Sequence, residues 1–175
     1  RKKIKDYIGN AKEKDIAIYA TFFGGGGWIG INENEKFSPA SMLKVPTMVA
    51  FLRYAESNPE ILSKQIYYDG SFNDNKFEYF KEKKSIVPDQ YYTVEELMDY
   101  MITYSDNNAT RLLNANIDRR YLVEIYSDLG IDLPTSSTVA IDFMSAKIYS
   151  IFLRILYSST YLSRDMSEKV LNLMT

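Results

Sequence analysis

The stretch FSPASMLKVPTMVAFL, residues 37–52, marks the point at which the sequence pattern becomes helical. After Pro39, apolar residues recur every three or four positions, as they do on one face of a helix. These residues are Met42, Val45, Met48, Val49 and Leu52. The pattern predicts a helix that ends near residues 56–59, where the sequence reads Glu-Ser-Asn-Pro.

Before this stretch the sequence predicts a β-hairpin. Residues 16–23 are rich in β-branched and aromatic residues, and residues 24–27 are four glycines that favour a turn. Residues 28–31 then form the returning strand. A short helix is expected ahead of the hairpin, at residues 3–13, because apolar side chains follow one stripe there.

After the stretch the pattern is mostly helical. Thr93 and Glu96 form a Thr-x-x-Glu capping box, which predicts the start of a helix that reaches Tyr104. Further helices are expected at about residues 109–113, 119–129, 141–156 and 163–173. Between the helix after Pro39 and the helix that starts at Thr93, residues 65–92 are polar and rich in tyrosine. We expect no strand after residue 60.

The predicted fold class is therefore α+β. It combines a mostly helical lobe, residues 37–175, with an N-terminal helix and hairpin, residues 1–36, on which the lobe packs. Because an isolated hairpin is only marginally stable in water, we expect it to be part of an antiparallel sheet. The strands that complete this sheet are expected after Thr175, so that residues 1–175 form a single incomplete domain.

Composition excludes several kinds of chemistry. The 175 residues contain no histidine and no cysteine, which rules out a Ser-His-Asp triad, a Cys-His pair and a thiolate zinc site. Any catalytic base must then be Lys, Asp, Glu or Tyr. The net charge of −2, without a basic cluster of binding size, argues against a nucleic-acid partner. No apolar stretch is long enough to span a membrane.

A glycine pattern in the hairpin resembles a nucleotide-binding motif only superficially. Gly25, Gly27 and Gly30 satisfy G-x-G-x-x-G. A dinucleotide fingerprint must open a helix, whereas these glycines lead into a strand. We therefore expect no cofactor and no metal ion.

Ser41 and Lys44 are the first candidate catalytic pair. They are three residues apart at the start of the predicted helix, so the hydroxyl and the amine can meet on one face. A lysine activates a serine only when its amine is neutral, which requires its pKa to fall from about 10.4 by roughly 3 pH units. A Ser-x-x-Lys pattern alone is weak, because Ser41 could equally cap the helix while Lys44 remains in solvent.

The tripeptide Ser105-Asp106-Asn107 favours the catalytic interpretation of that pair. By chance it is expected only about 0.07 times in such a chain, and it follows a helix that could face the first one. The alternative interpretation is a turn between helices. In that case Asp106 or Asn107 caps the helix near Ala109, and we expect Asp106 to do so in either case.

Together these motifs resemble the serine β-lactamase and penicillin-binding protein superfamily, closest to its class A β-lactamase-like branch. The resemblance rests on FSPASMLKVP at residues 37–46, YTVEEL at 92–97 and YSDNNA at 104–109. It covers most of the chain and ends about where the family's last strands would start.

The resemblance implies a role for each candidate residue. Ser41 would be the acylated nucleophile, Lys44 its general base and Ser105 the proton relay to the leaving nitrogen. Asn107 would bind the amide carbonyl of the substrate, while Asp106 would be mainly structural. The substrate would be a β-lactam or a D-alanyl-D-alanine peptide, attacked outside the cytoplasm through an acyl-enzyme.

Two departures from the family pattern qualify this activity. The Lys-Thr-Gly motif is absent from residues 1–175 and is expected on a strand after Thr175. The Glu-x-x-Leu-Asn loop that serves deacylation is also absent, since residues 132–140 contain no glutamate. Asp132 and Asp142 are substitutes only by their position in the sequence. Deacylation is therefore expected to be slow.

Two alternative functions follow from the same observations. The chain could be a catalytically impaired module that binds cell-wall peptides with the same fold. It could also be a folding fragment whose exposed strand edges pair with another chain.

Overall fold

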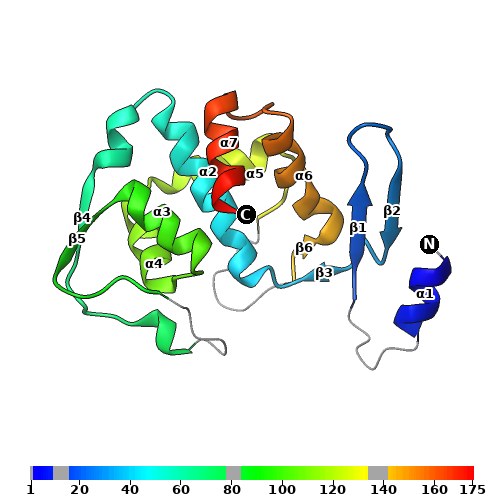
Figure 1. Cartoon of the computed structure of the whole chain (residues 1–175), viewed down its shortest axis with the longest axis horizontal. Helices are drawn as coiled ribbons and strands as arrows, with labels where there is room; N and C mark the ends of the chain where they lie inside the picture. The colour runs from blue at the N-terminus through cyan, green and yellow to red at the C-terminus, as the bar shows by residue number, and fades with distance from the viewer. Residues whose placement is uncertain (1, 10–15, 78–83, 134–141) are drawn as a thin grey trace. The chain divides into compact units, whose positions relative to one another are not determined.

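The computed structural model describes residues 2–9, 16–77, 84–133 and 142–175, which group into two units (Figure 1). The first unit contains residues 1–39 and 131–154, and the second contains residues 40–130 and 155–175. That all 175 residues form one domain stays a prediction.

The predicted hairpin is confirmed in the first unit. Strands β1 (Ile18–Thr21) and β2 (Trp28–Ile31) pair antiparallel, from Thr21 opposite Trp28 to Ile18 opposite Ile31 (Figure 1). In the connecting turn the N–H of Phe22 donates to the carbonyl of Gly27 at 2.9 Å. Gly26 has a φ of +69°, which favours glycine at this position of the turn.

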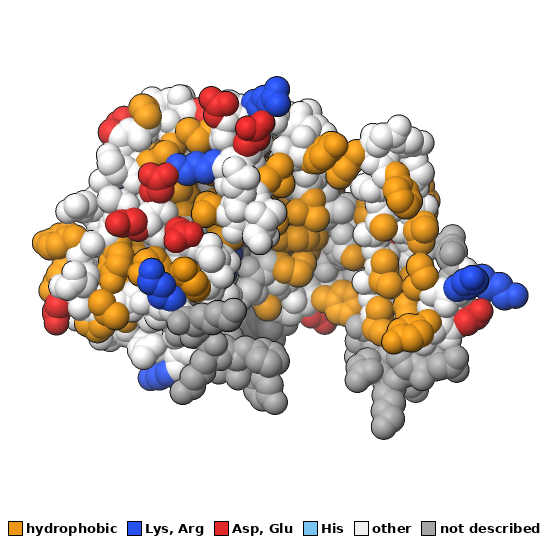
Figure 2. Space-filling model, viewed as in Figure 1, with side chains coloured by type: hydrophobic (Ala, Val, Ile, Leu, Met, Phe, Trp, Pro, Cys, Tyr) orange, Lys and Arg blue, Asp and Glu red, His pale blue; other side chains and the backbone are white. Residues whose placement is uncertain are grey.

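Helix α1 (Lys2–Gly9) precedes the hairpin, as predicted, and residues 10–15, where the predicted helix would end, lie outside the described residues. Apolar side chains are exposed along the hairpin, among them Phe22, Phe23 and Trp28 (Figure 2). β1 and β2 form a sheet of two strands within the described part of the chain.

A second strand pair in the first unit corrects the prediction for the long helix after residue 141. Strand β3 (Lys36–Phe37) pairs antiparallel with β6 (Met144–Ser145), and helix α6 (Ala146–Tyr157) begins only after β6. The hydroxyl of Ser145 accepts a hydrogen bond from the N–H of Ile148 at 3.1 Å. This side chain satisfies one of the free amides of the first turn and so fixes the start of α6.

Helix α2 (Lys44–Ala55) is the centre of the second unit. The 3₁₀ helix η1 (Ala40–Leu43) leads directly into it, so the predicted helix after Pro39 is confirmed. Nearly every residue of α2 is buried, including Met48, Phe51 and Leu52, each 0–1% exposed. A helix that is apolar on all sides has to be enclosed by its neighbours.

The helices that enclose α2 are α3 (Val94–Thr103), α4 (Asn107–Asn116), α5 (Arg119–Asp128) and α7 (Arg164–Leu173). All four are predicted by the sequence within a few residues. The capping box of α3 is present: Thr93 Oγ1 accepts the N–H of Glu96 at 3.1 Å, and Glu96 Oε2 accepts the N–H of Thr93 at 2.7 Å. Gly130, with a φ of +64°, follows α5 as predicted.

The expectation that no strand follows residue 60 is wrong. After the short 3₁₀ helix η2 (Pro59–Ser63), strand β4 (Gln65–Tyr68) pairs antiparallel with β5 (Gln90–Thr93). In β4, Ile66 and Tyr68 are buried while Gln65 and Tyr67 are exposed, which is the two-residue period of a strand. Tyrosine fits both faces of this ladder, so alternation between apolar and polar residues is weak in the sequence.

The described fold is therefore α+β with a mostly helical lobe, as predicted. No described helix has both the length and the apolar character that crossing a membrane requires.

A buried hydroxyl in α7 gives a stability prediction. Ser167 is 1% exposed, and its Oγ has no hydrogen-bond partner among the described residues. An unsatisfied buried hydroxyl costs about 1–3 kcal/mol, so Ser167→Ala should raise the free energy of unfolding by about 1 kcal/mol. Urea denaturation measures this change. Ser127→Ala, on the exposed face of α5, gains the same helix propensity and should change stability much less.

Candidate active site

The two motifs singled out in the sequence meet in the second unit. Lys44 Nζ donates to the carbonyl oxygen of Ser105 at 2.5 Å and lies 2.9 Å from the Ser105 hydroxyl oxygen. Ser105 Oγ in turn donates to Ser41 Oγ at 3.3 Å. A chain of hydrogen bonds therefore connects Ser41, Ser105 and Lys44 across more than sixty residues of sequence.

Local structure explains how Ser41 and Lys44 share one face. Ser41 lies in η1, and Lys44 is the first residue of α2. In a 3₁₀ turn, side chains three residues apart eclipse one another, so residues 41 and 44 lie on the same side of this turn. The free N–H groups of this first turn are also directed toward the same end of the helix.

The side chains of Ser41, Ser105 and Lys44 differ in their exposure to solvent. Ser41 and Ser105 are exposed, whereas Lys44 is only 5% exposed. The two hydroxyls are therefore open to a ligand from solvent, while the amine lies beneath them. This arrangement suits an exposed nucleophile with a base held behind it.

Ser105 adopts an unusual backbone conformation. Its φ is +57°, in the left-handed region that disfavours residues with a Cβ. It follows the end of α3, where the N–H of Asp106 returns to the carbonyl of Tyr100 at 3.1 Å. Glycine is the usual residue at such helix ends, and a strained residue there persists only when its surroundings hold it.

The strain at Ser105 gives a prediction that compares two variants. Both Ser105→Ala and Ser105→Gly lose the hydroxyl, but only glycine relieves the left-handed φ. The glycine variant should therefore be more stable than the alanine variant by about 1 kcal/mol. At Thr103, within α3, the order should be reversed, because glycine weakens a helix. Thermal or urea unfolding of the four variants measures both differences.

Asp106 caps α4, as the sequence predicts. Its carboxylate is fully buried and accepts the N–H groups of Asn108 at 2.8 Å and Ala109 at 3.1 Å. It also accepts the N–H of Ile86 at 2.8 Å and the hydroxyl of Ser85 at 2.9 Å. These donors compensate the cost of burying the charged group.

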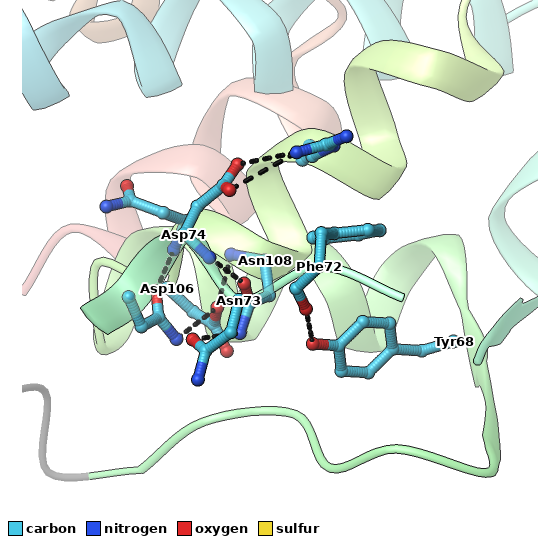
Figure 3. A network of polar contacts seen from close by, with 9 residues as sticks. Tyr68, Phe72, Asn73, Asp74, Asp106 and Asn108 are labelled. Carbon is cyan, nitrogen blue, oxygen red and sulfur yellow. Dashed lines mark hydrogen bonds and ion pairs between the residues drawn. The ribbon is translucent and has the colours of Figure 1, made fainter. Parts of the chain in front are cut away.

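Further polar residues surround this carboxylate, and sequence analysis did not identify them (Figure 3). Asn75, in the 3₁₀ helix η3 (Asp74–Phe77), donates from Nδ2 to Asp106 Oδ1 at 3.0 Å. Asn108 Oδ1 accepts the N–H of Asp74 at 2.7 Å. Such partners are 20–35 residues away from the motif, and no local pattern marks them.

Tyr68 lies in the same region, and its hydroxyl donates to the carbonyl oxygen of Phe72 at 2.5 Å (Figure 3). Burial, and after it the negative charge of Asp106, raises the pKa of Tyr68 above its ordinary value. The phenol therefore stays protonated at neutral pH and keeps its role as a donor.

The remaining candidate residues are placed as follows. Asn107 is the first residue of α4, two residues after Ser105 in the chain. Asp132 and Asp142 are exposed residues of the first unit, outside regular structure. Most of the segment 132–140 lies outside the described residues. In the described ranges no group of three or more acidic side chains could hold a metal ion.

A mostly helical lobe that presents a serine and a lysine one turn apart at the start of a buried helix defines a class of protein, the serine β-lactamases and penicillin-binding proteins. The chain belongs to the β-lactamase enzyme family, whose model matches residues 1–175. Comparison with the sequences of curated proteins finds no match.

Solved structures support the same fold. A β-lactamase from Streptosporangium roseum is 21% identical with a TM-score of 0.80, over 100% of this chain and 68% of that one. The carbapenemase VCC-1 from Vibrio cholerae is 21% identical with a TM-score of 0.79, over 99% of this chain and 70% of that one.

An acyl-enzyme complex of a PBP-A mutant with penicillin G is also similar, at 20% identity and a TM-score of 0.72, over 99% of this chain and 67% of that one. The chain thus spans about two thirds of these proteins. It spans 58% of another matched β-lactamase.

Proposed function

We propose that the protein is a serine acyl-hydrolase of the β-lactamase or D,D-peptidase type. Its substrates are β-lactams or D-alanyl-D-alanine peptides, and the reaction passes through an acyl-enzyme on Ser41. The observation that carries this proposal is the hydrogen-bond chain from Ser41 Oγ through Ser105 Oγ to Lys44 Nζ. It connects an exposed hydroxyl to a buried amine, as a nucleophile and its base require.

Acylation follows from these contacts in two steps. Lys44, in its neutral form, takes the proton of the Ser41 hydroxyl by way of Ser105 Oγ, while Ser41 Oγ bonds to the carbonyl carbon of the substrate amide. The oxyanion that forms is stabilised by the backbone N–H of Ser41 at the first turn. The amide C–N bond then breaks and leaves the acyl group as an ester on Ser41.

The leaving nitrogen needs a proton, and Ser105 is placed to supply it. Ser105 Oγ gives its proton to the nitrogen and is reprotonated by the Lys44 ammonium, 2.9 Å away. The proton taken from Ser41 thus leaves with the amine. The side chain of Asn107 donates to the amide carbonyl of the substrate and sets its orientation. This role is adopted from the family motif, and the position of Asn107 directly after Ser105 and Asp106 supports it.

Slow release of the acyl group is part of the proposal. Residues 132–140 contain no glutamate, so the residue that activates water for deacylation in class A β-lactamases has no counterpart there. The PBP-A complex with penicillin G shows that a protein of this fold can hold such an acyl-enzyme. We also propose that the protein works outside the cytoplasm, in keeping with cell-wall peptides and β-lactams as substrates.

Intact-mass spectrometry after incubation with penicillin G tests this function. The protein should gain one penicillin mass that persists for minutes, and Ser41→Ala should gain none. Ser38→Ala removes a nearby exposed serine of the same segment and should still be acylated. If the unchanged protein binds a cell-wall peptide without any adduct, the alternative of a non-catalytic binding module is favoured instead.

A further inference from the structure

The side-chain amide of Asn75 hydrogen-bonds mainly to the Ser105-Asp106-Asn107 motif, which begins thirty residues later in the chain. Its Oδ1 accepts the backbone N–H of Asn107 at 2.7 Å. Its Nδ2 donates to Asp106 Oδ1 at 3.0 Å and to Ser85 Oγ at 2.7 Å. The residue is 7% exposed, so these bonds do not compete with water.

The contact with Asn107 satisfies a backbone N–H group that an N-cap side chain normally leaves without an acceptor. An N-cap side chain accepts from the second and third N–H groups of a helix, and Asp106 does so at Asn108 and Ala109. The first N–H of α4, that of Asn107, is not among the described donors to Asp106. Asn75 accepts it instead, from a different segment of the chain.

The chemistry of the amide explains why this position carries asparagine. The side chain must accept from one N–H and donate to two oxygens at the same time, and a carboxamide does both. A carboxylate would lose the donors and place a second negative charge beside Asp106. An aliphatic side chain would leave the N–H of Asn107 and the oxygens of Asp106 and Ser85 short of partners.

We propose that Asn75 is a positioning residue for the acylation reaction. It fixes the backbone N–H of Asn107 and the carboxylate of Asp106, and thereby the direction in which Ser105 and Asn107, on either side of Asp106, face the substrate. The left-handed φ of Ser105 is held by its surroundings rather than by the intrinsic preference of the residue, and Asn75 binds the two residues that follow it. This inference rests on the proposed function, since Ser105 and Asn107 take their roles from it.

The test compares Asn75→Ala with Asn73→Ala. Asn73 is exposed and bonds weakly to Asn108, with 3.4 Å between Asn73 Oδ1 and Asn108 Nδ2, and has no described hydrogen bond to the motif backbone. The second-order rate constant of acylation by a fluorescent penicillin should fall by about 10- to 100-fold in Asn75→Ala and stay unchanged in Asn73→Ala. Adding Asn107→Ala to Asn75→Ala should then cause little further loss. Additive effects of the two substitutions would overturn the proposal.

Hydrogen exchange provides a readout that does not depend on activity. The backbone N–H of Asn107 should exchange faster in Asn75→Ala, while amides of α3 such as those of Met98 and Met101 keep their protection. Unchanged exchange at Asn107 would overturn the role of Asn75, whereas absent acylation in the unchanged protein would overturn the proposed function. Where Asn75→Ala does not fold, Asn75→Ser keeps a polar group in the network and is measured in the same two ways.

Discussion

Replacing Lys44 by alanine is expected to slow acylation of Ser41 by penicillin by about a thousandfold, the typical contribution of a general base. The amine of Lys44 is buried and bonded to both oxygens of Ser105, and Ser105 Oγ bonds to Ser41 Oγ. Without the amine, the Ser41 proton has no acceptor along this chain. Stopped-flow acylation with a fluorescent penicillin measures the rate.

A second substitution at the same position shows whether Lys44 acts as a base or only through its positive charge. Lys44→Arg keeps the charge, but a guanidinium is not deprotonated at accessible pH and cannot act as a base. Its acylation rate should therefore be as low as that of Lys44→Ala. Lys64→Ala, at an exposed lysine of the same unit, is the control and should acylate normally. Rapid acylation by Lys44→Arg would contradict the role given to Lys44.

Replacing Asp106 by alanine is expected to lower the free energy of unfolding by about 3–5 kcal/mol, because several buried donors lose their acceptor at about 1–3 kcal/mol each. The carboxylate is fully buried and accepts hydrogen bonds from Asn75, Ser85 and three backbone N–H groups. Alanine leaves all of these donors without their acceptor. Urea denaturation monitored by circular dichroism measures the loss.

Asp118 offers the matched control for this prediction. It caps α5 as Asp106 caps α4, and accepts the N–H of Arg120 at 2.9 Å, but its side chain is 41% exposed. Asp118→Ala should cost only about 1 kcal/mol, the ordinary value of a helix cap. Equal losses at the two positions would mean that the buried network around Asp106 adds nothing. If Asp106→Ala does not fold, Asp106→Asn, which keeps one acceptor oxygen, gives the comparison.

Sequence reasoning was most successful where the signal is local. The apolar spacing from Met42 to Leu52 predicted α2, and the Thr93 and Glu96 pair predicted the start of α3. Asp106 was predicted as a cap because Asp is a favoured residue at that position. The two motifs could be placed together because each stands at a helix end, and the structure brings their side chains within hydrogen-bond distance.

Features that depend on distant partners could not be predicted in the same way. Strand β4 is stabilised by its pairing with β5, twenty-two residues or more along the chain, and its tyrosines give no clear alternation. The start of α6 depends on Ser145, whose hydroxyl caps the helix after a strand of only two residues. Asn75 and Ser85 become part of the site only through Asp106, since nothing in their own neighbourhood indicates chemistry.

The location of the acyl group tests the central claim most directly, because the claim is that Ser41 is the nucleophile of a site completed by Lys44 and Ser105. Digestion of the penicillin-treated protein with trypsin gives peptide 37–44, FSPASMLK, which contains both Ser38 and Ser41. Fragmentation in the mass spectrometer distinguishes the two serines. We predict the penicilloyl group on Ser41 alone. A label on Ser38, on another peptide or on none would contradict the account.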